Sequence, residues 1–180
     1  MKGFIKWALF ILIINAILMI VGYFTMDENA MRNGEGGVGQ ILYYLGMVVA
    51  LVCLYLGIRE KKMNNPSEFT FGKGFTEGLL ISVMSGLFIG ILSYAFYSFI
   101  APEAIELIRE SSYAAMEAQG TSPEQMDAAR GMMDFFISPL GFMITTLIMY
   151  TIGGIILSLI MSAVVNATGP KSGGNEPVTV

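Results

Sequence analysis

The sequence predicts an all-α, polytopic membrane protein with four transmembrane helices and an external acidic helical hairpin between the third and the fourth. Hydrophobic residues make up 54% of the 180 positions and charged residues only 13%, against about 25% charged in an average soluble domain. Four apolar stretches each reach the roughly 20 residues that a helix needs to cross the hydrocarbon core. A helix is required because lipid offers backbone N–H and C=O groups no hydrogen-bond partner. At this length we expect one membrane domain, residues 1–180.

The four predicted spans differ in the polar residues that they contain. The first is interrupted only by Lys6 and Asn15, and the third carries one acid, Glu77, near its start. The second and the fourth contain no charged residue. We expect the four to pack as a four-helix bundle. Their predicted positions are about residues 4–24, 38–58, 75–100 and 140–165.

The first apolar stretch has an alternative interpretation as a signal peptide, because Lys2 and Lys6 precede it. The apolar part of a signal peptide is only about 7–15 residues long and ends in a small-x-small cleavage site. Here the apolar run continues to Phe24, and the Thr25-Met26-Asp27 that follows is a poor cleavage site. We therefore expect an uncleaved transmembrane helix.

Lys and Arg residues are distributed unevenly over the two sides of the predicted bundle. The side with the N-terminus, the 59–74 connection and the C-terminal tail carries seven cations and four acids. The side with the 25–37 and 101–139 loops carries three cations and ten acids. Since the side richer in Lys and Arg is the cytoplasmic one, we expect both termini in the cytoplasm and both loops outside.

Two segments beyond the spans have the composition of flexible chain. The 25–37 loop contains Asn33-Gly34 and Gly36-Gly37, which indicate a short flexible turn. The tail, residues 166–180, contains Gly169-Pro170 and Gly173-Gly174 and is predicted to be disordered.

Residues 102–138 have the pattern of two short helices. Pro102 suits the first position of one helix, and Gly120 suits its end. Ser122 can cap a second helix, with Gln125 at the capping-box position. The predicted hairpin is acidic, and its acids are Glu103, Glu106, Glu110, Glu117, Glu124, Asp127 and Asp134.

The predicted second hairpin helix has an apolar face and a charged one. Arg130 can reach Asp127 and Asp134 at spacings of three and four residues. The apolar face packs on the hairpin itself and on the mouth of the bundle, or it forms a surface for a partner, for which methionine is adaptable. Its members are Met126, Ala129, Met133 and Phe136.

Several short motifs occur along the chain in a characteristic order. They are Met1-Lys2-Gly3-Phe4, Leu56-Gly57-Ile58-Arg59, Phe69-Thr70-Phe71-Gly72-Lys73-Gly74-Phe75 with Gly78, the segment from Gly120 to Glu124, and Ser138-Pro139. In this order they resemble an uncharacterised bacterial family of four-span membrane proteins, domain of unknown function 4199, over nearly the whole chain. The resemblance implies the cytoplasmic (inner) membrane of bacteria that have an outer membrane. It implies no activity and no catalytic residues.

Small residues recur at every fourth position in the third predicted span and again in the fourth. In lipid there is little hydrophobic drive between helices, so small residues that let backbones approach are a main source of association. We expect these two stripes to face each other or a neighbouring subunit, with a substrate path as the alternative. The stripes are Gly74, Gly78, Ser82, Gly86 and Gly90, and Gly154, Ser158 and Ser162.

Two polar residues inside the spans are candidates for function. A carboxylate in a span, here Glu77, is a functional candidate because ionisable groups are costly in lipid. It lies one helical turn after Lys73 near the predicted interface, so an ion pair with that lysine is the simpler interpretation. Asn15 lies midway along the first span and is expected to make an interhelical hydrogen bond rather than a ligand contact.

Enzyme chemistry has little support in the sequence. There is no histidine, and the single cysteine, Cys53, excludes an intrachain disulfide and a multi-cysteine metal site. We expect Cys53 to be a buried apolar residue rather than a lipidated or redox-active thiol. No catalytic or phosphate-binding motif is present, so we expect no enzyme activity, cofactor or metal. A net charge of −4 gives no reason to expect nucleic acid as a partner.

Two hypotheses about function remain. The first is a non-enzymatic accessory or structural protein that associates, with a second copy or another membrane protein, through its spans and its hairpin. The second is a small transporter or channel, or a subunit of one, in which Glu77 and Ser- and Thr-bearing helix faces line a path. The first is favoured, because four spans without a central charge offer little coordination chemistry.

Overall fold

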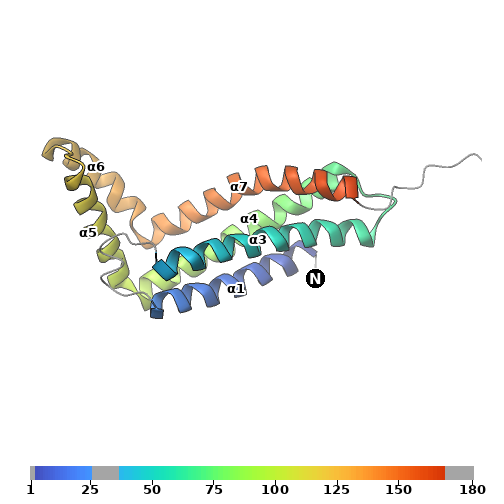
Figure 1. Ribbon diagram of the computed structural model, residues 1–180, viewed down its shortest axis with the longest axis horizontal. Coiled ribbons are helices and arrows are strands. Elements are labelled where there is room, and N and C mark those ends of the chain that lie inside the picture. The colour runs from blue at the N-terminus through green and yellow to red at the C-terminus, as the bar shows by residue number, and fades with distance from the viewer. Residues whose placement is uncertain (1–2, 26–36, 169–180) are drawn as a thin grey trace, which may run out of the picture.

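The structure is a computed structural model that describes residues 3–25 and 37–168, and in these residues it is all-α. Four helices are long and apolar enough to cross a membrane, which confirms the predicted four-span fold. They lie side by side as an elongated bundle, with two shorter helices projecting from one end (Figure 1). The elements are α1 (Gly3–Thr25), α3 (Gly37–Asn64), α4 (Phe71–Ala95), the π-helix η1 (Phe96–Ile100), α5 (Pro102–Ala118), α6 (Pro123–Phe136) and α7 (Pro139–Thr168).

Several helices extend beyond the apolar stretches that predicted them. The second predicted span ended at residue 58, but α3 continues through its charged last turns to Asn64. The third begins at Phe71 rather than at residue 75, because the Thr70 side chain caps it by accepting a hydrogen bond from the Lys73 N–H. The last helix reaches Thr168, so the first residues of the predicted disordered tail are helical. The rest of that tail and most of the 25–37 loop lie outside the described residues.

Three pairs of helices make the most extensive contacts in the bundle. The α4 and α7 helices pack against each other most extensively, and α1 packs against both α3 and α4. The largest apolar core contains fully buried Ile11, Ile58, Ile81 and Val165, which come from all four helices. A smaller core forms where Phe96, Ala101 and Ala104 meet the end of α1.

The helical hairpin between the third and fourth spans is present as the sequence predicts. Gly120 ends the first helix with a φ of 76°, a backbone conformation that favours glycine. The Ser122 side chain accepts a hydrogen bond from the Gln125 N–H, and the Gln125 side chain accepts one from the Ser122 N–H, which completes the predicted capping box. The hairpin is tilted away from the bundle axis toward the side of α7 (Figure 1).

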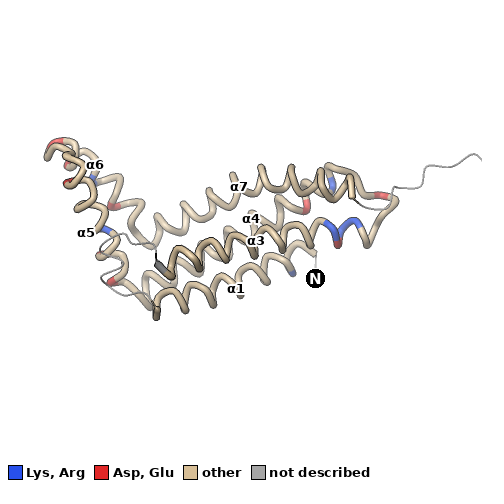
Figure 2. The backbone as a smooth tube through the Cα atoms, viewed as in Figure 1, with Lys and Arg blue, Asp and Glu red and all other residues tan. Residues whose placement is uncertain are grey.

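Charges gather at the two ends of the bundle, as Figure 2 shows. We call the end that holds the α3–α4 connection the basic end, because the described Lys and Arg residues outside the hairpin lie there. These are Lys6, Arg59, Lys61, Lys62 and Lys73. The opposite end carries the acidic hairpin (Figure 2).

Candidate functional site

The small residues of α4 and α7 meet in one interface within the chain. A Cβ built at Gly78 would lie 2.6 Å from the Ser158 Oγ, and one built at Gly154 would lie 2.3 Å from the Ser82 Cβ. Both distances are shorter than side chains tolerate, so only glycine allows the two backbones to approach this closely.

The interface continues along the rest of α4. A Cβ at Gly74 would lie 2.5 Å from the Ser162 Oγ, and Ser162 itself donates a hydrogen bond to the Phe71 carbonyl at 2.7 Å. Toward the hairpin, a Cβ at Gly86 would lie 2.6 Å from the Tyr150 Cβ. A Cβ at Gly90 would lie 3.0 Å from the Met143 carbonyl oxygen. The structure therefore places both predicted stripes on the α4–α7 seam, facing each other.

Asn15 lies between α1 and α3, but the predicted interhelical hydrogen bond is wrong. Its side-chain amide donates to the Ile11 carbonyl of the same helix at 2.9 Å. The side-chain oxygen instead lies 2.7 Å from the position that a Cβ at Gly46 would take. The Asn15 amide thus makes a hydrogen bond within α1, and its side chain packs against Gly46 of α3.

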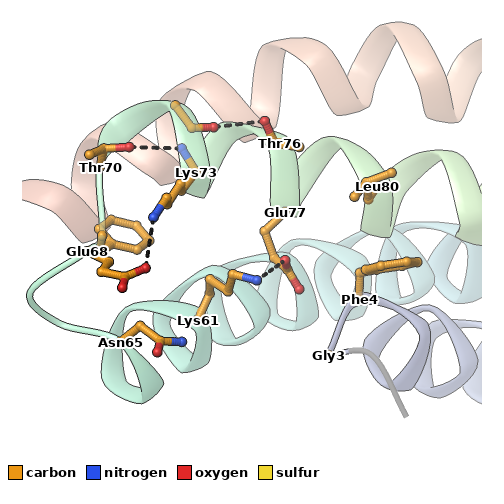
Figure 3. A pocket seen from close by; sticks show the side chains of 12 residues that line it. Gly3, Phe4, Lys61, Asn65, Glu68, Thr70, Lys73, Thr76, Glu77 and Leu80 are labelled. Carbon is orange, nitrogen blue, oxygen red and sulfur yellow. Dashed lines mark hydrogen bonds and ion pairs between the residues drawn. The ribbon is translucent and has the colours of Figure 1, made fainter.

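Glu77 is buried at the basic end, with 6% of the residue exposed. Its carboxylate lies 3.3 Å from the Lys61 ammonium of α3, whereas Lys73 pairs with Glu68 at 3.2 Å (Figure 3). The predicted Glu77–Lys73 pair is therefore wrong. The Glu77 Oε1 also lies 3.2 Å from the position of a Cβ at Gly3, beside the first turn of α1. A carboxylate is favourable there because the helix dipole is positive at that end.

Two further polar contacts tie the basic end together. The Glu60 carboxylate of α3 accepts hydrogen bonds from the Lys6 ammonium at 2.5 Å and from the Trp7 indole N–H at 2.6 Å. The buried Lys62 ammonium donates to the carbonyls of Val165 and Asn166 at the end of α7. A cation at that position is stabilised by the negative end of the helix dipole. Together with Glu77, these contacts join all four spans.

A cavity of about 800 Å³ opens beside Glu77. It lies between the start of α1, the end of α3 and the first turns of α4 (Figure 3). Its lining is Gly3, Phe4, Lys61, Asn65, Glu68, Phe69, Thr70, Gly72, Lys73, Thr76, Glu77 and Leu80. No spacing in the sequence indicated this cavity, because it depends on how three helices end relative to one another. Within residues 3–25 and 37–168, no group of three or more Cys, Asp or Glu side chains is placed to hold a metal ion.

Arg109 joins the two helices of the hairpin. Its guanidinium lies 2.8 Å from the Glu106 carboxylate and 3.1 Å from the Asp134 carboxylate of α6, and it donates to the Ile137 carbonyl. Asp134 also accepts a hydrogen bond from the Tyr113 hydroxyl. Arg130 pairs with Asp127 as predicted, but its second predicted partner, Asp134, is held by α5 instead.

The apolar side of α6 is only partly covered. Met126 is buried and Met133 is half-buried. Phe136 was predicted to share that face, but it is exposed because the helix ends there and the chain turns into α7. Phe135 and Met132 are exposed beside it, with 68% of Met132 accessible.

A strap links the base of the hairpin to α1. The Tyr23 hydroxyl donates a hydrogen bond to the Glu103 carboxylate in the first turn of α5. This hydrogen bond lowers the pKa of Glu103, and a backbone hydrogen bond in the same turn acts in the same direction. The hydrogen bond is therefore stronger when Glu103 is ionised than when it is protonated.

These features define a four-span α-helical membrane protein with a helical hairpin between its third and fourth spans. The chain belongs to the DUF4199 family, described as a protein of unknown function, whose sequence profile matches residues 6–166. Comparison with curated proteins and with solved structures finds no match.

The close packing of α4 and α7 predicts that two adjacent glycines of α7 differ in their tolerance of a larger side chain. We expect Gly154→Ala to destabilise the protein by about 1–3 kcal/mol, because the new methyl group overlaps Ser82. Gly153→Ala is the matched control, since a Cβ there meets nothing within 4 Å. Thermal unfolding in detergent measures the difference. Equal melting temperatures for the two variants would show that the seam does not depend on close packing.

The hydrogen bond between Tyr23 and Glu103 predicts that the stability of the protein depends on pH. Because the pKa of Glu103 is lowered in the folded protein, its stabilising effect is present above the unfolded-state pKa and is lost as the pH falls through the folded-state value. We expect Tyr23→Phe to reduce the loss of stability on acidification. Unfolding in detergent at several pH values measures this. Tyr44→Phe is the control, because Gln40 and not a carboxylate is its hydrogen-bond partner. An unchanged pH dependence in Tyr23→Phe would contradict the prediction.

Proposed function

We propose that this protein is a non-enzymatic accessory or structural protein of the bacterial inner membrane, in which the four spans anchor the hairpin. The observation that carries the proposal is that the bundle and the hairpin are stabilised separately. The small residues of α4 and α7 pack against each other within the chain. The hairpin, in contrast, is stabilised by its own capping box and by the Arg109 bridge, and it projects away from the bundle (Figure 1).

The proposed partner surface is the end of α6. Met132, Phe135 and Phe136 are exposed there, next to the acidic residues of the hairpin. Flexible methionine beside aromatic side chains suits contact with another protein, because these side chains provide adaptable apolar area. A membrane protein partner or a second copy of the chain would then be held at the hairpin side of the bilayer.

A transporter or channel is the second candidate function, and one observation favours it. Glu77 is a buried carboxylate that lines a cavity of about 800 Å³. A transport carboxylate must exchange a proton or a cation. Against this role, Glu77 lies beside Lys61 and the start of α1, and α4 approaches α7 closely along the rest of its length.

The orientation in this proposal has the basic end in the cytoplasm and the hairpin outside. We expect a cysteine placed at Gln119 to react with an impermeant thiol reagent in cells whose outer membrane alone is permeable. A cysteine at Ser67, in the α3–α4 connection, should react only after lysis. Both positions are exposed, and Cys53→Ala removes the native thiol. Labelling of the Ser67 site in intact cells would contradict the proposed orientation.

Complementation of a deletion strain separates the two functions. We expect replacement of residues 103–137 by a short Gly-Ser linker to abolish function, because the hairpin is the working part. Glu77→Gln should retain function, since the amide keeps hydrogen bonding in place of the carboxylate. Membrane abundance of each variant is measured in parallel. Loss of function with Glu77→Gln but survival without the hairpin would contradict the accessory role and favour transport.

A further inference from the structure

The cavity at the basic end changes from polar to apolar along the bundle axis. The Lys73–Glu68 ion pair and Asn65 lie at the end formed by the α3–α4 connection (Figure 3). Phe4 and Leu80 form the opposite end of the lining, deeper along the spans (Figure 3). A site with this gradient fits a molecule that has a polar head and an apolar chain.

The apolar end of the cavity continues along the surface of α4. Lys73 and Leu80 are seven residues apart, as are Leu80 and Leu87, and Ile91 follows four residues later. At 3.6 residues per turn these four residues lie on one face of the helix. Leu80, Leu87 and Ile91 are exposed, with 52% of Ile91 accessible. An exposed apolar stripe on a spanning helix faces the hydrocarbon of the bilayer.

The charges of the lining indicate the kind of head group. Two cations and two acids line the cavity as the pairs Lys61–Glu77 and Lys73–Glu68. A simple anion or a simple cation would meet as many like charges as opposite ones. A head group with a phosphate and an ammonium can interact favourably with both members of an exposed pair, and Lys73 and Glu68 are the exposed pair.

We propose that the cavity binds a zwitterionic phospholipid whose head group carries a primary ammonium, as phosphatidylethanolamine does. The phosphate accepts hydrogen bonds from Lys73 and Asn65, and the ammonium donates to Glu68. An acyl chain lies along Leu80 and Leu87. A primary ammonium is specified because a quaternary one has no N–H to donate to the carboxylate. The volume of about 800 Å³ is in the range of ligand pockets.

Native mass spectrometry of the full-length protein in detergent tests the proposal. Phosphatidylethanolamine, phosphatidylglycerol and phosphatidylcholine with identical acyl chains are titrated separately. We expect phosphatidylethanolamine to bind at least about tenfold more tightly than phosphatidylcholine, as the loss of one charge-assisted hydrogen bond predicts. Lys73→Gln and Glu68→Gln should each weaken its binding by about the same factor. Both side chains are largely exposed, with 51% and 72% accessible, so these variants are expected to fold.

The controls separate this site from general lipid adhesion. Arg130→Gln and Asp127→Gln remove an exposed ion pair of similar length in the hairpin and should leave binding unchanged. Equal binding of all three lipids, tighter binding of phosphatidylglycerol, or an unchanged affinity in both cavity variants would overturn the proposal. Competition by water-soluble glycerophosphoethanolamine at the affinity of the lipid would also overturn it, because the ligand would then be a soluble metabolite.

Discussion

The close approach of α4 and α7 is the constraint on which the rest of the structure depends. Helices in lipid gain little from the hydrophobic effect, so their association relies on van der Waals contact between backbones and on a few hydrogen bonds. Gly78 against Ser158 and Gly154 against Ser82 supply that contact. Because α4 leads into the hairpin and α7 leaves it, their separation also sets the width of the hairpin base. At the other end, the hydrogen bond from Ser162 to the Phe71 carbonyl joins α7 to the first turn of α4.

The two ends of the bundle are stabilised in different ways. At the basic end, Glu77 and Lys62 are buried, and a buried charge is tolerated only where it is paired or hydrogen-bonded. Lys61 and the carbonyls of α7 fill those roles, so the charges also position the helix ends. In the hairpin the Arg130–Asp127 pair is exposed at both partners, and exposed pairs contribute only about 0–1 kcal/mol each. Its order therefore depends more on the capping box, Gly120 and the contacts of Arg109 across both helices.

Features that depend on local composition could be predicted from the sequence, whereas the exact ends of the helices could not. Four spans follow from four long apolar stretches, and the hairpin follows from Pro102, Gly120 and the Ser122–Gln125 box. Hydropathy marks the hydrocarbon and not the end of a helix, so α3 was predicted to end at residue 58 while its polar last turns continue to Asn64. Of the two interpretations of the apolar face of α6, packing does not extend to Phe136, which is exposed because it is the last residue of that helix.

The sequence by itself determined the number of spans, the charge difference between the two ends and the small residues available for close packing. The tertiary structure alone decided which polar groups of different helices meet. Local spacing favoured Lys73 as the partner of Glu77, yet Lys61 on another helix is the partner. Lys6 pairs with Glu60, 54 residues away, and Asp134 is held by Arg109 rather than by Arg130. In these three cases the packing of whole helices brings an opposite charge near the side chain, and the distance between two such groups on different helices cannot be read from their neighbours along the chain.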